Sequence, residues 1–119
     1  MKIKHITFMV RDIEKSIAFY ELMAELKVVR RFTVEKAELA FLSNGEGETE
    51  IEFVERDGAK FEGKGMFVCF ETDKLKEMHA LAERQELNPS PVQDPGDGTR
   101  YFYVYDPDGV SVQLREFQD

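Results

Sequence analysis

The sequence predicts an α+β fold made of two βαβββ modules. Strand-like alternation and helix-like spacing follow one another in the same order in both halves of the 119-residue chain. The halves also match in residue character at a constant offset of 61 positions. We therefore expect one domain, residues 1–119, composed of pseudo-repeats at 1–57 and 65–117 with a short linker between them.

The first half begins with a predicted strand at residues 2–10, where the side chains alternate between two faces. Asp12 is then placed to cap a helix, because an Asp side chain accepts a hydrogen bond from the first free backbone amides. The apolar stripe of this helix consists of Ile17, Tyr20 and Met23. Strands are expected at about 28–34 and 38–42, and the stretch "TEIEFVE" forms a further strand after the turn "SNGEGE".

The second half repeats this order from Gly65, with "MFVCFETD" as its first strand. A helix follows, whose inward residues are predicted to be Leu75, Met78, Leu81 and Ala82. The stretches "TRYFYVY" and "VSVQLREF" form strands on either side of the turn "DPDG". The segment "NPSPVQDPGDG" is too rich in Pro and Gly for regular structure and is predicted to be a loop.

Composition and charge exclude several classes of function. The net charge of −8 repels phosphate backbones and anionic lipids, so neither nucleic acid nor a membrane is an expected partner. The single cysteine, Cys69, excludes an internal disulfide and is expected to be a buried small hydrophobe. No stretch resembles a signal peptide or a membrane span, which favours a cytoplasmic location.

The offset of 61 makes a geometric prediction about a site. It matches His5 with Met66 and Glu52 with Gln113, and each of these residues lies on the strand face opposite the helix-packing residues. A pseudo-two-fold arrangement of the modules would bring the four side chains toward one concavity. His5 then has three interpretations: a metal ligand, a buried neutral imidazole, or a hydrogen-bonding partner of Glu52, which is the one we favour.

Three stretches carry a resemblance to a known family: "KHITFMVRDIEKSIAFY", "EIEFVE" and "YDPDGVSVQLREF". Together with the repeat, the chain resembles the vicinal-oxygen-chelate superfamily, which includes glyoxalase I, extradiol dioxygenases and the bleomycin- and fosfomycin-resistance proteins. The resemblance implies a strongly curved sheet around a cleft, usually in a homodimer. It also implies a divalent metal ion in those members that use one.

Transferred residue by residue, the family's metal ligands fall on His5, Glu52, Met66 and Gln113. His5 and Glu52 fit the pattern, and the amide of Gln113 is a weak ligand. Met66 stands where a second His is expected, and its soft thioether suits Zn, Ni, Mn or Fe ions poorly. We therefore expect no cofactor or a weakly bound divalent metal held by His5, Glu52 and Gln113.

Three functions remain open. The favoured one is binding of a small organic ligand in a cleft with an incomplete metal site, since acidic and aromatic side chains suit a cationic ligand. The first alternative is a metal-dependent lyase or isomerase of the glyoxalase I type, with Glu52 as the base. The second is a non-enzymatic protein-interaction module. Dioxygenation fits least, because the only other histidine, His79, is expected to face solvent on the second helix.

Overall fold

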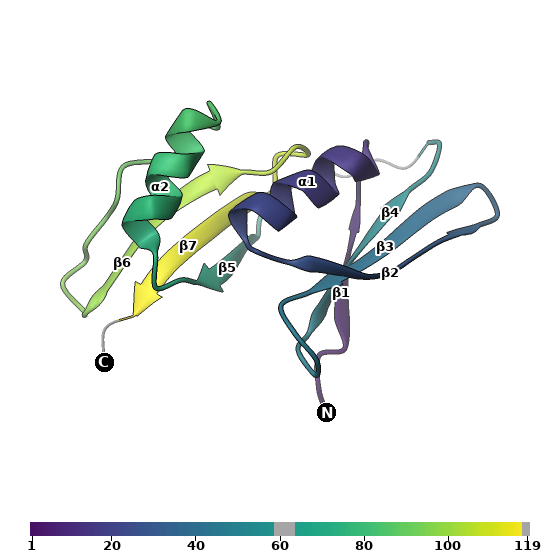
Figure 1. The fold of residues 1–119 in the computed structure, drawn as a ribbon, viewed down its shortest axis with the longest axis horizontal. Coiled ribbons are helices and arrows are strands. Elements are labelled where there is room, and N and C mark those ends of the chain that lie inside the picture. The colour runs from purple at the N-terminus through teal and green to yellow at the C-terminus, as the bar shows by residue number, and fades with distance from the viewer. Residues whose placement is uncertain (59–63, 118–119) are drawn as a thin grey trace. The chain divides into compact units, whose positions relative to one another are not determined.

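The computed structural model describes residues 1–58 and 64–117 and confirms the α+β fold class. The chain divides into two compact units, Met1–Glu62 and Gly63–Asp119. Within the described residues, each unit contains one helix and one sheet, whose elements are labelled in Figure 1. Neither helix within the described residues is long and apolar enough to span a membrane.

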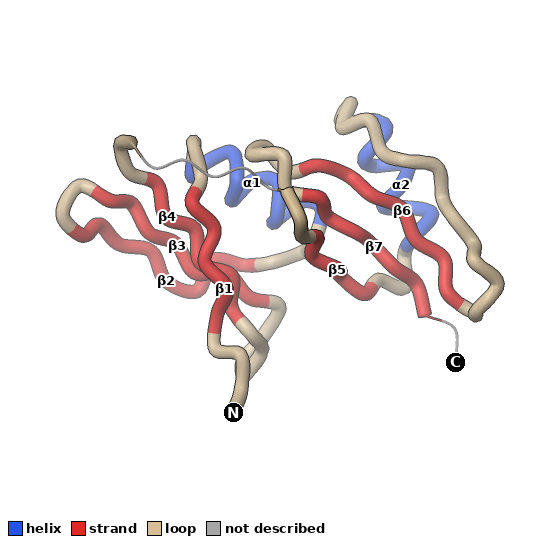
Figure 2. The backbone as a smooth tube through the Cα atoms, turned by 180° about the vertical axis from the view of Figure 1, so that it is seen from behind, coloured by secondary structure: helices blue, strands red, loops and turns tan. Residues whose placement is uncertain are grey.

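The first unit has the predicted order of strand, helix and three strands. Its elements are β1 (His5–Met9), α1 (Ile13–Met23), β2 (Lys27–Val34), β3 (Ala37–Ser43) and β4 (Glu50–Glu55). The sheet order is β1-β4-β3-β2, in which β1 runs parallel to β4 and the other neighbours are antiparallel. Figure 2 shows these strands side by side beside α1.

Helix α1 packs against β3 and β4 and supplies most of the core on that face. The Asp12 side chain accepts a hydrogen bond from the Lys15 backbone amide, which confirms the predicted cap. Tyr20 is fully buried, and its ring lies 6.2 Å from that of Phe8 and 5.2 Å from that of Phe53. The predicted stripe therefore forms the core, because its spacing places these side chains on one side of the helix.

The second unit comprises β5 (Phe67–Glu71), α2 (Leu75–Arg84), β6 (Thr99–Tyr105) and β7 (Ser111–Phe117). Its described sheet has three strands, in the order β5-β7-β6, where the repeat predicted four. Residues 88–93 run beside β6 instead, joined to it by an isolated bridge between Gln93 and Tyr101. Pro89 and Pro91 interrupt a regular ladder there because proline has no backbone N–H to donate.

Strand register corrects the assumption of a constant offset. In the first unit His5 pairs with Glu50, 45 positions later, whereas in the second Phe67 pairs with Ser111, 44 positions later. Glu50 and Ser111 begin β4 and β7, whose burial patterns match over the first six residues, so the offset of 61 holds for these strands. The register counterpart of His5 is therefore Phe67, and Met66 precedes β5.

Two side chains differ from their predicted environments. Cys69 is exposed, because it lies on the face of β5 opposite α2, where it pairs with Gln113. The prediction that Cys69 is buried was wrong, because the more buried side chains of β5 are those of Val68 and Phe70, which point to the other face of the strand. His79 does not simply face solvent: its side chain is 21% exposed and lies against the ring of Phe102.

Candidate functional site

A row of cross-strand neighbours runs over the first unit's sheet on the face away from α1. Thr7 of β1 pairs with Glu52 of β4, Glu52 pairs with Phe41 of β3, and Phe41 pairs with Arg30 of β2. The core residues Phe8 and Phe53 lie on the opposite face, because successive side chains alternate along a strand. The row therefore places a carboxylate, a hydroxyl, an aromatic ring and a guanidinium on one surface.

Glu52 is the chemically important member of this row. It is only 8% exposed, and its Oε1 accepts a 2.6 Å hydrogen bond from the Thr7 hydroxyl. His5 Nε2 lies 3.6 Å from the same oxygen, which is ion-pair distance when the imidazole is protonated but too long for a good hydrogen bond. The structure thus brings His5 and Glu52 together, while Thr7 makes the hydrogen bond.

Phe41 lies between His5 and Arg30. The His5 ring meets it edge-on at 5.5 Å and 88°, and the Arg30 guanidinium lies 4.4 Å from its centroid. Arg30 also donates two hydrogen bonds to Glu50, at 2.6 and 3.2 Å, and this contact lowers the pKa of the Glu50 carboxyl below its usual range. The charge of Glu50 is therefore matched within the protein, whereas Glu52 faces a hydroxyl and an imidazole.

The second unit has the same row with different chemistry. Cys69 pairs with Gln113, and Gln113 pairs with Tyr103, whose hydroxyl accepts a 2.8 Å hydrogen bond from Gln113 Nε2. Phe67 meets the Tyr103 ring edge-on at 5.6 Å and 89°. This geometry matches that of His5 and Phe41, and it supports Phe67 as the counterpart of His5.

The sequence-based prediction matched His5 with Met66 rather than Phe67, although a signal for Phe67 was present. The first strands share the pattern His5-x-x-Phe8 and Phe67-x-x-Phe70, which corresponds to an offset of 62. Met66, the residue predicted for this position, is 39% exposed and lies outside the strand. Whether all four predicted site residues share one cleft stays a prediction, since His5 and Glu52 belong to one unit and Met66 and Gln113 to the other.

Phe67 and Tyr103 belong to an open pocket of about 580 Å³, here called the aromatic pocket. Its size falls within the usual range of small-molecule sites. Tyr105, which is 66% exposed, and Ser111 complete its sheet side, and the residues Asn88, Pro89, Ser90 and Pro91 form its other wall. Tyr103 and Tyr105 of β6 thus line this pocket, while Phe102 and Val104, on the other face of the strand, are buried under α2.

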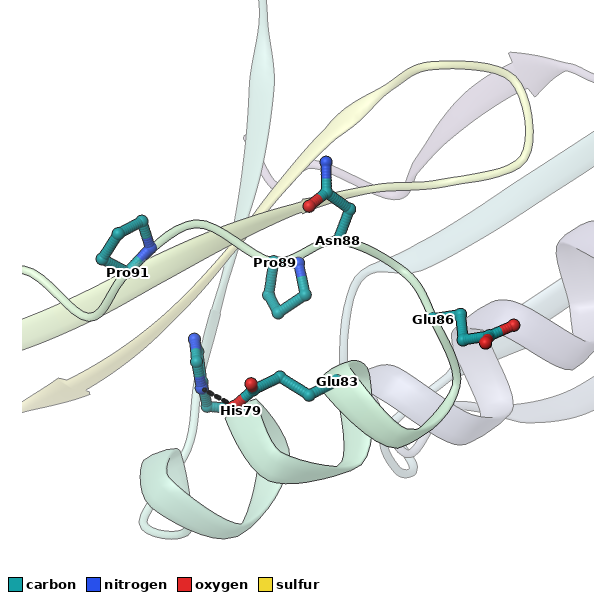
Figure 3. A pocket seen from close by; sticks show the side chains of 6 residues that line it. All are labelled: His79, Glu83, Glu86, Asn88, Pro89 and Pro91. Atoms are coloured by element: carbon teal, nitrogen blue, oxygen red, sulfur yellow. Dashed lines mark ion pairs between the residues drawn. The ribbon is translucent and has the colours of Figure 1, made fainter.

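A second pocket of about 560 Å³ adjoins α2 (Figure 3). It is lined by His79, Glu83, Glu86, Asn88, Pro89 and Pro91. We call residues 88–93 the strap, because this segment contributes to both pockets and runs along β6. Figure 3 shows the His79 ring extending from α2 toward the strap, while the Glu83 side chain runs along the helix to the His79 ring.

The donor set does not fit the metal site that the resemblance implies. His5 and Glu52 are suitable ligands and lie close together, but Phe67 has no donor atom at the position where a second imidazole would be needed. The Gln113 amide nitrogen already donates to Tyr103, and its oxygen is a weak neutral ligand. Among residues 1–58 and 64–117, no three His, Cys, Asp or Glu side chains are grouped to hold a metal ion.

Comparisons with known proteins agree with this fold. The chain is 36% identical to the protein YwbC of Bacillus subtilis (strain 168) over 120 residues, which cover 95% of each. It is similar in structure to the trypanothione-dependent glyoxalase I of Leishmania major, with a TM-score of 0.81 and 25% identity over 96% of this chain and 85% of that one.

The structure is also similar in fold to TnmS3, an antibiotic-binding protein from Streptomyces sp. CB03234, with a TM-score of 0.82 and 16% identity over 99% of this chain and 97% of that one. A family model described as Glyoxalase/Bleomycin resistance protein/Dioxygenase superfamily matches residues 2–114. The chain therefore belongs to the Glyoxalase/Bleomycin resistance protein/Dioxygenase superfamily.

Proposed function

We propose that this protein binds a small organic ligand with a planar aromatic part, and that binding needs no metal ion. One observation carries the proposal: a phenylalanine, Phe67, replaces an imidazole at the register position of His5 and packs against Tyr103. The replacement removes a nitrogen ligand and adds apolar surface. It therefore favours contact with a ring over coordination of a metal.

The aromatic pocket has the chemistry that such a ligand requires. Phe67 and Tyr105 are 54% and 66% exposed, and large exposed rings in one concavity are typical of a binding surface. Tyr103 is held in place by Gln113, and Ser111 supplies a hydroxyl at the pocket wall. The net charge of −8 favours a cationic aromatic ligand over an anionic one.

A metal-dependent lyase or isomerase of the glyoxalase I type is the second candidate. The pair of His5 and Glu52 favours it, because two ordinary metal ligands lie within 3.6 Å of each other in the first unit. Glu52 is also the residue that would act as the base, since it is a shielded carboxylate on this face. In this role Gln113 would be a third, weak metal ligand.

Titration with a planar aromatic dye tests the first proposal. Proflavine, a cation whose fluorescence changes on stacking, should bind with saturation at one site per chain, equally well before and after chelation of divalent metals. Phe67→Leu should weaken binding about tenfold, the value of one aromatic contact. Phe117→Leu is the matched control, since Phe117 is 49% exposed on the same sheet but does not line the pocket.

Two outcomes would reject this function. The aromatic pocket is not the binding site if Phe67→Leu and Phe117→Leu lose affinity equally. The same conclusion follows if neither proflavine nor neutral acridine binds with saturation. Stoichiometric uptake of Zn²⁺ or Ni²⁺ that disappears in His5→Ala and Glu52→Ala would favour the lyase instead. Capture of a protein partner without either result would favour the interaction module.

A further inference from the structure

The strap separates the aromatic pocket from the pocket beside α2. Asn88, Pro89 and Pro91 line both of them. A displacement of this segment would change both pockets at once. The contacts that hold the strap therefore also determine the shape of the aromatic pocket.

Ser90 is the residue through which the strap is attached on both sides. Its backbone N–H donates to the Tyr103 carbonyl at 2.9 Å, and its hydroxyl accepts from the Tyr103 backbone N–H at 2.8 Å. On the other side, the Ser90 carbonyl lies 2.8 Å from His79 Nε2. His79 is thus a side chain of α2 that connects the helix to the strap, and its ring packs edge-on against Phe102 at 4.9 Å.

The second nitrogen of His79 faces another acceptor. Nδ1 lies 3.1 Å from Glu83 Oε1, one helical turn away, so both ring nitrogens point at oxygens that can only accept a hydrogen bond. A neutral imidazole has one N–H and can satisfy only one of these two acceptors, whereas an imidazolium satisfies both. In the neutral ring, Glu83 and Ser90 therefore compete for a single proton.

The other charged groups around His79 are few. Glu86 lines the same pocket as Glu83, and Lys76 and Arg100 line a neighbouring pocket that also includes His79. Arg100 is already paired with Glu116 at 2.6 Å. Among the residues lining these two pockets, Glu83 is the one that forms an ion pair with His79.

We infer that His79 is a positioning residue for the aromatic pocket: it holds the strap through the Ser90 carbonyl, and Glu83 weakens that contact when the ring is neutral. The strap should be held most firmly when both ring nitrogens of His79 carry a proton. It should be held less firmly when the ring is neutral and its single N–H donates to Glu83. The consequence for ligand affinity rests on the proposed function. The behaviour of the strap does not.

Three substitutions separate the parts of this arrangement. His79→Gln keeps an N–H donor for Ser90 but cannot gain a proton. His79→Phe keeps a ring against Phe102 but has no donor. Glu83→Gln removes the competing carboxylate and can itself donate to Nδ1, which leaves the Nε2 proton for Ser90.

Amide hydrogen exchange in the protein without ligand tests the inference. The reporters are the amides of Ser90 and Gln93, which donate to Tyr103 and Tyr101. In the wild-type protein we expect their protection, corrected for intrinsic exchange, to fall about threefold from pH 5 to pH 8, the range in which histidines titrate. The fall should be absent in Glu83→Gln and His79→Gln, and His79→Phe should show low protection at every pH.

A wild-type pH profile that persists unchanged in Glu83→Gln would overturn the inference, as would full protection in His79→Phe. Amides of β7, in the same unit as the strap, serve as the internal control, because a general loss of stability would lower their protection too. Nitrogen chemical shifts of the His79 ring give a separate readout, and an Nδ1–H tautomer with an intact strap at pH 8 would contradict the competition.

The effect on the ligand is measured separately with proflavine. His79→Phe should weaken its binding several-fold, and His79→Gln should restore it. If exchange at Ser90 changes as expected but proflavine affinity does not, the link between strap and pocket is wrong. If proflavine does not bind the wild-type protein at all, the proposed function fails while the exchange results still decide the role of His79.

Discussion

Glu52 lies on a nearly covered surface, where neighbouring side chains replace part of the water that its carboxyl group loses. The Thr7 hydroxyl donates to it directly, and the His5 ring lies at ion-pair distance. A carboxylate in this position has a substantial desolvation cost, which a hydrogen bond from a neutral hydroxyl partly offsets. The side chain is therefore available for interaction with a ligand without being an unpaired buried charge.

Removal of the Thr7 hydroxyl measures this compensation. Thr7→Val keeps the β-branched shape and should lower the free energy of unfolding by about 1 to 2 kcal/mol, because it deletes a hydrogen bond to a covered carboxylate. Thr33→Val is the matched control: its hydroxyl donates to Glu38 at 2.9 Å at an exposed position of the same sheet. Urea unfolding should show a smaller loss for Thr33→Val, and equal losses would contradict the role given to burial.

Cys69 is exposed, but partial burial of its thiol raises its pKa above the ordinary value of 9.0. Only the thiolate reacts with disulfide reagents. The folded protein should therefore react slowly at pH 7, and the rate should rise about tenfold per pH unit toward the pKa. At one pH the urea-unfolded chain should react faster than the folded protein; a slower unfolded chain would contradict the direction of the shift.

The two helices begin in different ways, although Asp73 lies 61 positions after Asp12, the offset that relates the two halves. Asp12 caps α1 with its side chain, whereas α2 begins after Lys74, which makes no side-chain capping hydrogen bond. The Thr72 hydroxyl accepts a hydrogen bond from the Lys74 backbone amide instead. The same element is thus started by different local chemistry in the two units.

Asp12→Ala should therefore cost about 1 kcal/mol of unfolding free energy, because the first turn of α1 loses an acceptor. Lys74→Ala should cost less than Asp12→Ala, since it removes no side-chain capping hydrogen bond. Thermal and urea unfolding of both variants check this difference. A loss in Lys74→Ala as large as that in Asp12→Ala would show that the caps do not control the two helix starts.

At the scale of the whole molecule, the sequence was sufficient for the fold class and for every element of the first unit. Its strands alternate cleanly, and Asp12 marks the helix start. In the described part of the second unit, the segment predicted to be a loop lies where the repeat would have a further strand. Pro89 and Pro91 exclude a regular ladder there but do not specify the extended path along β6. The prediction of a loop there was correct in composition but missed its hydrogen bonds to Tyr101 and Tyr103.

The candidate site could be predicted only in part. His5 and Glu52 were identified, because both lie in clearly alternating strands. Phe67 was missed because side chains on a strand change face at every residue, so an error of one position exchanges one face for the other. The register of β5 is determined by its pairing with β7, more than forty residues later in the chain. The residue pattern of β5 alone therefore cannot predict it.

The edge strand β2 of the first sheet suggests that two chains associate. All eight residues of β2 are exposed, including Val28, Val29, Phe32 and Val34 at 37% to 47%. An apolar edge strand of this kind is usually covered in the native assembly. We expect a homodimer, with twice the 13.8 kDa chain mass in sedimentation experiments.

Val29→Lys should shift this dimer toward monomer, because a charged side chain on an edge strand opposes association. Leu22→Lys is the control, since Leu22 is 40% exposed on α1. A wild-type protein that sediments as a single chain at micromolar concentration would reject the dimer. A similar shift in both variants would reject the participation of β2.

Because the two units differ by one residue in strand spacing, a metal-binding histidine could be introduced in the second unit at either of two adjacent positions, residue 66 or residue 67. Phe67→His would install an imidazole beside Tyr103, at the position equivalent to His5, whereas Met66→His would install it before β5 begins. We expect calorimetry to detect tighter Zn²⁺ binding in Phe67→His alone. Tighter Zn²⁺ binding in Met66→His instead would mean that the constant offset of 61, rather than the strand register, identifies the equivalent of His5.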